Sequence, residues 1–231
     1  MASSAAAPAT DAVIAAGEFE DSRAHAIALL DGEQRASLTT LLHVGASRHE
    51  DIVGERSGAV LRLARAADLD AIDRLTVDGY RAIQASYVAM LGDECYEAVR
   101  LEPELTWEER KTKQNRDLFA VHPEQVWVLD RDGDVFGFVT FWLIHERSYG
   151  HIDNNAVRVD RAGEGWATFM YRQVLEHFRE LGLRFAHVDT GLDEAHIPAR
   201  RAYEAVGFDR AVPTVDYWQD LTRRNPGSAV E

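Results

Sequence analysis

The strongest constraint on the fold is a pair of β-rich runs that flank a turn rich in aspartate. Val126–Leu129 and Val135–Ile144 consist largely of β-branched, aromatic and other apolar residues, and the turn between them reads Asp130-Arg-Asp-Gly-Asp134. An Asp-Gly turn between two such runs predicts a β-hairpin. The second run is apolar on both of its faces, which predicts a central strand that is covered on both sides.

Hydrophobic periodicity predicts further strands and helices around this hairpin. We expect strands at 59–65, 151–159, 184–189 and 211–218, and helices at 68–79, 82–99, 106–119, 165–181 and 197–206. Such an order of elements predicts a mixed α/β (α+β) fold in which helices cover one sheet.

The chain of 231 residues is long enough for one domain and an extension. We interpret residues 1–57 as an N-terminal leader with one or two short helices, in which the polar stretch 49–58 is a linker. Residues 58–221 form the predicted main domain, and residues 222–231 form a flexible tail.

Composition excludes several classes of function. With 25 Lys and Arg against 39 Asp and Glu, the net charge is 25 − 39 = −14, which argues against binding to nucleic acid or to anionic membranes. The single cysteine excludes an intramolecular disulfide and a cysteine-rich zinc site. We find no apolar run of about 18 residues and no secretion signal, so we expect a cytoplasmic protein.

We predict no metal site from the sequence. Asp130, Asp132 and Asp134 mimic a calcium-binding loop, but Gly133 comes too early and Phe141 occupies the position that requires a bidentate glutamate. The nine histidines are scattered and include no close pair at metal-ligand spacing.

The junction between the strand at 151–159 and the helix at 165–181 can bind an anion. The glycines Gly163 and Gly165 allow a tight turn and the close approach of a ligand to the backbone. The first N–H groups of a helix lack internal acceptors, and the helix dipole favours negative charge there. The same glycines also fit a simple turn. Thr168 stands where a dinucleotide-binding fingerprint requires a third small residue, and no Gly-Lys-Ser/Thr follows.

Together with a second segment, this junction resembles the GNAT superfamily of N-acetyltransferases over about residues 59–220. The first motif appears as Ala162-Gly163-Glu164-Gly165-Trp166-Ala167, with Ala162 where the family usually carries Gln or Arg. The second appears as His196-x-x-Ala199-x-x-x-Tyr203-x-x-x-Gly207-Phe208, with His196 in place of the usual Asn. The resemblance implies a mostly antiparallel central sheet with helices on both faces, preceded here by the N-terminal helical extension.

The resemblance also implies a site for acetyl-CoA, or another acyl-CoA, as co-substrate. The backbone of Val157, Arg158 and Val159 would pair with the pantetheine arm, and the amides that follow would hold the pyrophosphate. The residues implied for binding the co-substrate are Val157, Arg158, Val159, Ala162, Gly163, Glu164, Gly165, Trp166, Ala167, Thr168 and His196.

By the same resemblance, Tyr203 is the general acid that protonates the departing thiolate. The alternative interpretation is that Tyr203 is an ordinary aromatic residue of the core. An alkyl amine has a pKa of about 10 and must lose a proton before it attacks the thioester. Asp153 is our candidate for the base, directly or through water, and His145 is the rival candidate.

We therefore expect an enzyme that moves an acetyl or other short acyl group to a primary amine of a small molecule. Residues 78–120 and 144–150 would shape the acceptor site. The basic cluster Arg110, Lys111, Lys113 and Arg116 is either a solvated helix face or a contact for the CoA 3′-phosphate or an acyl carrier protein. A carrier-bound acyl donor and a non-catalytic CoA-binding module are the alternatives, and a homodimer remains open.

Overall fold

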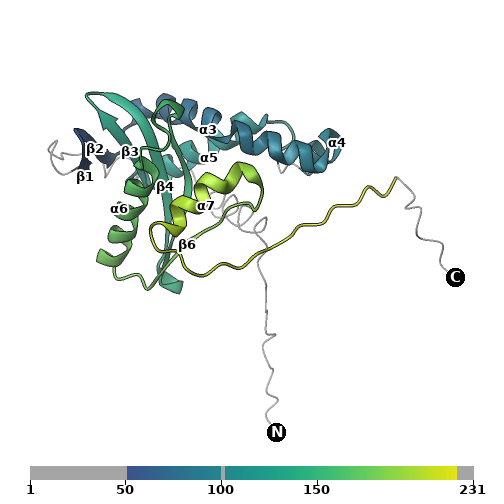
Figure 1. Ribbon diagram of the computed structural model, residues 1–231. Coiled ribbons are helices and arrows are strands. Elements are labelled where there is room, and N and C mark those ends of the chain that lie inside the picture. The colour runs from purple at the N-terminus through teal and green to yellow at the C-terminus, as the bar shows by residue number, and fades with distance from the viewer. Residues whose placement is uncertain (1–50, 100–101, 223–231) are drawn as a thin grey trace, which may run out of the picture.

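A computed structural model describes residues 51–99 and 102–222, which build one six-stranded sheet in the order β1-β2-β3-β4-β5-β6 (Figure 1). The strands are β1 (Ile52–Arg56), β2 (Ala59–Leu63), β3 (Val126–Arg131), β4 (Asp134–Ile144), β5 (Tyr149–Val157) and β6 (Phe185–Val188). The helices are α3 (Leu69–Leu91), α4 (Asp93–Ala98), α5 (Trp107–Val121), α6 (Trp166–Glu180) and α7 (Ile197–Glu204). Neighbouring strands run antiparallel except β5 and β6, which run parallel.

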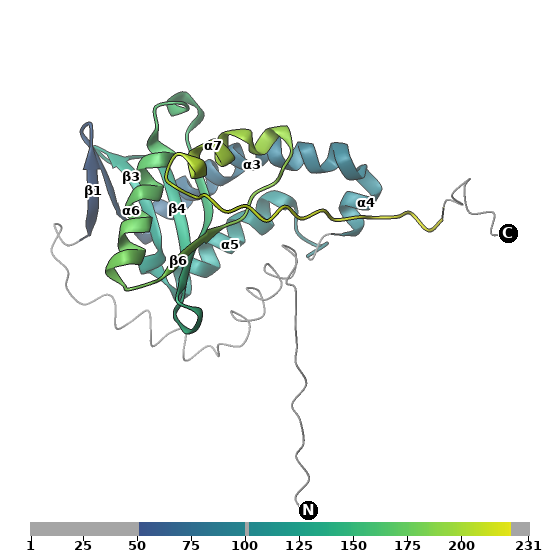
Figure 2. The same cartoon turned by 60° about the horizontal axis from the view of Figure 1, so that its bottom comes forward.

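Helices cover both faces of the sheet, as the sequence predicts. Helices α3 and α5 lie on one face and α6 lies on the other, with α7 beside α6 and β6 (Figures 1 and 2). Two clusters of buried side chains fill the two layers. The α6 layer includes Trp127, Phe141, Ile152, Met170, Val174 and Phe178, and the α3–α5 layer includes Ile72, Leu75, Leu118, Val128 and Phe138. The expected mixed, helix-covered sheet is therefore confirmed.

The predicted hairpin is β3–β4. Asp132 and Gly133 have φ of 55° and 88°, so both central residues of the turn have the positive φ that a two-residue hairpin of the I′ kind requires. Strand β4 is central, and its side chains are buried on both faces: Phe136 and Phe138 are 1% and 0% exposed.

Two expected boundaries differ from the structure. The stretch 49–58 was predicted as a linker, which is wrong for Ile52–Arg56, because these residues form β1 and pair with β2 through a turn at Ser57 and Gly58. The helices expected at 68–79 and 82–99 are divided differently: α3 runs without a break from Leu69 to Leu91, and the short α4 follows Gly92, where φ is 76°. The polar Asp78 and the small Gly79 therefore do not interrupt α3.

The strand predicted at 211–218 is also wrong. Residues 209–220 adopt no regular secondary structure and lie outside the body (Figures 1 and 2). Their apolar pattern suits a strand, but no strand of the same chain pairs with them among the residues that the structure describes. Most of the N-terminal extension, residues 1–50, and the tail after residue 222 lie outside the described residues. No helix in 51–99 or 102–222 is long and apolar enough to span a membrane.

A buried ion-pair network fixes β2 to its neighbours. The Arg62 guanidinium donates two hydrogen bonds to Asp68, at 2.7 and 3.0 Å, and two to Asp130, at 2.9 and 2.7 Å. The Arg62 side chain is 8% exposed and the Asp68 side chain is 10% exposed. Burial raises the pKa of Asp68, but hydrogen bonds from Arg62 and the Arg65 backbone outweigh it and lower the pKa overall. The network joins β2, the start of α3 and the end of β3.

We predict that Arg62→Ala destabilises the protein by about 3–5 kcal/mol, because it leaves two buried carboxylates without a cation. Chemical denaturation followed by circular dichroism measures this free energy of unfolding. Arg116→Ala is the matched control: Arg116 also binds two aspartates, Asp70 and Asp73, but its side chain is 43% exposed. Its loss should cost about 1 kcal/mol or less. Equal costs for the two variants would contradict the role of burial.

Candidate active site

Strands β5 and β6 separate halfway along β5. They pair only from Tyr149 with Phe185 to Ile152 with Val188. The second half of β5 continues to Val157, paired with β4 alone. On the side away from β4, the backbone of residues 153–157 has no strand partner in the described part of the chain. An extended ligand can therefore occupy this side as a strand would.

An irregularity in the β4–β5 register puts the successive β5 residues Asp153 and Asn154 on the same face of the sheet, so that Asp153 and Asn155 lie on opposite faces. Val139 pairs with Asn155 and Phe141 with Ile152, so two β5 residues, Asp153 and Asn154, oppose one β4 residue. Asp153 contacts Trp142 and Thr140, whereas Asn155 contacts tyrosines of α6 and α7. The bulge places an acidic group on the α3–α5 side and an amide on the α6–α7 side of the point where the strands separate.

The loop after β5 ends at a helix N-terminus without a side-chain cap. Gly163 and Gly165 have φ of 79° and 78°, and Gly165 is the residue that precedes α6. Gly165 has no side chain that could cap the backbone N–H groups of the first turn of α6. The N–H groups of Trp166, Ala167 and Thr168 have no acceptor within the helix, because an α-helix leaves its first amides without partners. The predicted anion site thus has its donors available.

Three arginines surround this loop. Arg56 of β1 donates a hydrogen bond of 2.6 Å to the Glu164 carbonyl oxygen and lies 4.5 Å above the Trp166 ring. Arg131 also lies 5.7 Å from that ring, and Arg161 forms a long ion pair of 3.9 Å with the Glu164 carboxylate. In a chain with a net charge of −14, this concentration of cations supports anion binding at the loop.

Tyr203 is buried and lies beside Asn155. It is 7% exposed, and its hydroxyl oxygen lies 3.5 Å from the Asn155 amide nitrogen. Asn155 also accepts a hydrogen bond of 2.6 Å from Tyr171, whose ring lies 5.0 Å from that of Tyr203. Burial raises the pKa of Tyr203; contacts with Asn155 and Tyr171 lower it in part, and the charges of Asp189 and Asp153 raise it further. The hydroxyl therefore keeps its proton at neutral pH.

Asp153 is oriented by two donors. Its Oδ2 accepts hydrogen bonds from Trp142 Nε1 at 3.1 Å and from Thr140 Oγ1 at 3.5 Å. Its charge influences the pKa of Tyr203, so the two predicted catalytic residues lie within electrostatic range of each other. The structure brings together Asp153, Tyr203 and the open half of β5, although they come from distant parts of the sequence.

Other expected residues are placed differently. The Arg158 N–H donates to the Phe136 carbonyl at 2.8 Å, so this donor is used within the sheet. Val159 follows β5 and is 70% exposed. His196 is buried and bonds Asp193, which also accepts from Ser86 of α3 at 2.6 Å. His196 thus fixes the start of α7 against α3.

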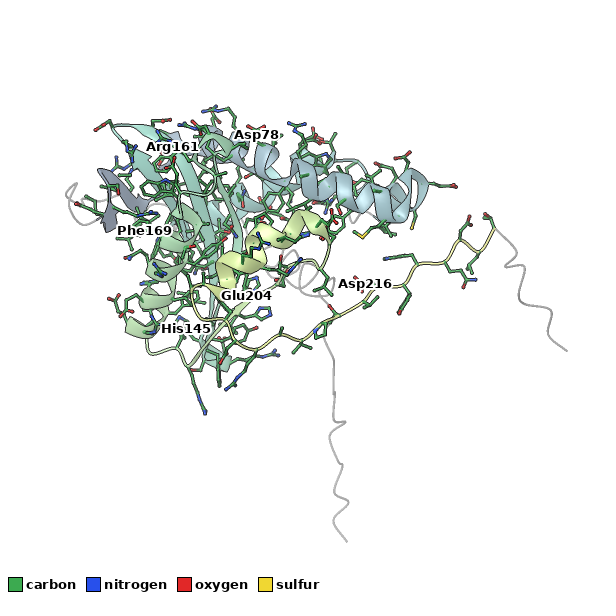
Figure 3. The ribbon with its side chains drawn as sticks, viewed as in Figure 1. Asp78, His145, Arg161, Phe169, Glu204 and Asp216 are labelled. Atoms are coloured by element: carbon green, nitrogen blue, oxygen red, sulfur yellow. The ribbon has the colours of Figure 1, made fainter. Side chains whose placement is uncertain are left out.

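His145, the rival base, is not part of the site. It is exposed at the β4–β5 connection, at the opposite end of the sheet from Arg161 (Figure 3). In the basic cluster, Arg116 pairs with Asp70 and Asp73, and Lys113 pairs with Asp117 and Glu102. These ion pairs favour the solvated-face interpretation for both residues.

Sequence reasoning missed a histidine pair at the end of the β5–β6 ladder. His151 and His187 are cross-strand partners, and their Nδ1 atoms lie 2.7 Å apart. Asp189 Oδ1 lies 3.4 Å from His151 Nε2. These three side chains offer ligand atoms within 4.8 Å of one another and could hold a metal ion. The signal was the repeat of His-Ile-Asp and His-Val-Asp, which becomes a cluster only when the two strands pair in register.

Strands that separate next to an uncapped helix, with a buried tyrosine between them, are typical of transferases that use an acyl-CoA. Residues 92–208 match the sequence profile of the Acetyltransferase (GNAT) family. The chain belongs to this family, which uses acetyl-CoA for acyl transfer. No curated protein sequence matches the chain.

Several solved structures are similar to the chain at low identity. One is the ribosomal-protein-S18-alanine N-acetyltransferase from Escherichia coli, at 14% identity and a TM-score of 0.47, covering 72% of this chain and 87% of that one. Another is a GNAT family acetyltransferase from Brucella melitensis in complex with acetyl-CoA, at 19% identity and a TM-score of 0.44, covering 70% and 95%. A third is Ard1 from Thermoplasma volcanium, at 18% identity and a TM-score of 0.48, covering 67% and 85%.

We predict that Asn155→Ala lowers the free energy of unfolding by about 1–3 kcal/mol, because the buried Tyr171 hydroxyl loses its acceptor. Tyr171→Phe removes the same hydrogen bond from the other end. Chemical denaturation of both single variants and of the double variant gives their coupling. Because the two changes break one interaction, the double variant should cost less than the sum. Simple additivity would contradict the hydrogen bond.

Proposed function

We propose that the protein transfers an acetyl group from acetyl-CoA to a primary amine of a small molecule. The observation that carries this proposal is the uncapped N-terminus of α6, which follows the open half of β5 and lies near the buried Tyr203. The α6 amides of residues 166–168 would bind the pyrophosphate, and three arginines supply positive charge around it. The pantetheine arm would extend along the unpaired side of β5 from Val157 towards Asn155.

The geometry favours a direct transfer with the acid and the base on opposite faces of the sheet. The amine nitrogen attacks the thioester carbonyl carbon and forms a bond to it, and Asp153, directly or through water, takes the proton that the amine loses. The carbon–sulfur bond then breaks. Tyr203, which burial keeps protonated, gives its proton to the departing thiolate. Asn155 orients the Tyr203 hydroxyl.

A polar network on the α3–α5 side supports an acceptor site near Asp153. Tyr80 donates to Asn154 at 3.0 Å, Asn154 donates to Asn115 at 3.0 Å, and Asn115 donates to Thr76 at 2.9 Å. These residues come from α3, α5 and β5, within or close to the region 78–120 that the sequence assigns to the acceptor. The acidic character of the chain favours a cationic acceptor.

The first experiment is a thiol-release assay with acetyl-CoA and a panel of amines, aminoglycosides, polyamines and amino acids, with an alanine-terminated peptide as the protein-like arm. Release that depends on a small amine supports the proposal. Release with the peptide alone would replace the acceptor class by a protein N-terminus. Binding of CoA without any release would favour a non-catalytic module, and transfer only from a carrier-protein thioester would replace the donor.

We predict that Tyr203→Phe lowers the rate of transfer by about 100-fold or more, because general-acid catalysis typically contributes 10²–10⁴-fold. The KM for acetyl-CoA should change little, since the α6 amides remain. Steady-state kinetics measures both constants. An unchanged rate in Tyr203→Phe would contradict the assignment of Tyr203 as the general acid.

We predict that Asp153→Asn lowers the rate of transfer by about 100-fold, because the variant has no carboxylate to take the proton from the amine. Steady-state kinetics measures this rate. His151 is a further candidate for the base, because its contact with the exposed His187 offers a route for protons to solvent. The variant His151→Gln tests it. If His151→Gln lowers the rate to this extent and Asp153→Asn leaves it unchanged, the histidine pair is the base.

A further inference from the structure

Three potential metal ligands meet where the β5–β6 ladder ends. His151 of β5 and His187 of β6 are cross-strand partners, and Asp189 is the first residue after β6. Each side chain offers one ligand atom, and these atoms all lie within 4.8 Å of one another. In residues 51–99 and 102–222, no other group of three His, Cys, Asp or Glu side chains comes together in this way. The register of two strands thus assembles a candidate site for a metal ion.

The donor set selects the class of metal ion. Imidazole nitrogens suit Zn²⁺ and neighbouring transition metals, whereas Mg²⁺ and Ca²⁺ prefer oxygen ligands. Two histidines and one carboxylate form a ligand set that binds Zn²⁺ in other proteins and leaves the fourth tetrahedral position for water. The net charge of −14 raises the concentration of cations near the surface. The chemistry of the three side chains therefore fits Zn²⁺ better than Mg²⁺ or Ca²⁺.

The separations of the ligand atoms are compatible with a tetrahedral ion. Bonds of about 2.0–2.1 Å from Zn²⁺ to nitrogen and oxygen place two ligand atoms about 3.3–3.4 Å apart. His151 Nε2 and Asp189 Oδ1 lie 3.4 Å apart. His187 contacts His151 through the two Nδ1 atoms at 2.7 Å, which is a hydrogen-bond distance. Because His187 is exposed, its ring can turn towards His151 Nε2 and supply the third ligand, with the metal bond replacing that hydrogen bond.

One of the three ligands is buried, and the other two face solvent. The His151 side chain is 2% exposed, whereas that of Asp189 is 58% exposed. His151 also lies opposite Trp142 of β4, so its position in the sheet is fixed. A buried ligand loses little further side-chain freedom when it binds a metal ion. The two exposed ligands give the ion a path of entry from solvent, which a metal site requires.

We propose that the protein binds one Zn²⁺ ion, or a related divalent transition metal, through His151, His187 and Asp189. Ile152 and Val188 form the last pair of the β5–β6 ladder, so the ion joins the two strands next to the point where they separate. This link stabilises the folded form, because the unfolded chain does not hold the three ligands together. No metal site is expected from the sequence, since the two histidines lie 36 residues apart and meet only through the strand register.

Isothermal titration calorimetry of the full, untagged chain tests the site, after EDTA has removed bound metal and has itself been removed. We expect one Zn²⁺ to bind per chain and Mg²⁺ not to bind at the same concentration. His187→Ala and Asp189→Ala should each weaken Zn²⁺ binding by about 100-fold or more, because even the loss of a partner behind a metal ligand costs about 10–100-fold. Both side chains are exposed, so neither change disturbs the core.

His145→Ala is the matched control. His145 is also an exposed histidine, but it lies outside the cluster, so this variant should keep the wild-type affinity for Zn²⁺. A wild-type chain that binds no Zn²⁺ would overturn the proposal, and so would wild-type affinity in either cluster variant. Equal binding of Mg²⁺ and Zn²⁺ would overturn it as well, because it would indicate a general attraction of cations to an acidic surface.

Thermal unfolding provides the second measurement. Zn²⁺ at about 100 times its Kd should raise the Tm by about 5–10 °C, because an ion that binds only the folded form stabilises it. The shift should disappear in His187→Ala and persist in His145→Ala. The same shift in His187→Ala would contradict the proposed ligand set. Neither measurement involves acetyl-CoA or an amine, so the outcome is separate from that of the proposed function.

Discussion

The loss of pairing between β5 and β6 after Ile152 is the constraint on which the rest of the site depends. Two parallel strands that remained paired would satisfy each other's backbone groups and leave no room for a ligand. Here the ladder ends, and the bulge at Asp153 and Asn154 places Asp153 and Asn155 on opposite faces of the sheet. One local irregularity therefore creates the open backbone, the position of the acidic group and the contact between Asn155 and Tyr203.

Helix α6 uses the same separation in a different way. Its first turn carries no side-chain cap, and a glycine in place of a capping residue costs a helix only about a few tenths of a kcal/mol. Gly165 in the left-handed region and Arg56 on the Glu164 carbonyl hold the loop in place without using the amides of residues 166–168. These contacts hold the loop, while the backbone N–H groups of residues 166–168 remain available as donors. Stability and ligand binding are served by different groups.

Much of the fold could be predicted from the sequence, because its signals are local. The hairpin follows from Asp132 and Gly133, and α5 from Thr106, which caps the helix together with Glu109. The strand at 211–218 could not be placed, since its pattern describes a strand without naming the neighbour. The linker prediction failed at β1 because a short strand with Gly54 and charged neighbours has little apolar periodicity.

The site was predicted in part, for a similar reason. The glycine loop and Tyr203 belong to contiguous motifs, so their resemblance to a family could be recognised. Asp153 and Tyr203 lie within electrostatic range of each other, while His145 lies at the far end of the sheet. The pair of His151 and His187 depends on the register of two strands, and the arginine at position 56 depends on a strand 108 residues before Glu164. Neither contact can be recognised from a short stretch of sequence.

The contact between Arg56 and the loop has an evolutionary consequence. Residues 92–208 carry the match to the family, yet a side chain that braces the glycine loop comes from β1, which precedes that region. Substitutions in the first strand can therefore change how firmly the loop would hold the ligand that we propose for it, while both motifs stay intact. A substitution at Arg56 would alter the support of this loop without changing any residue of the two motifs.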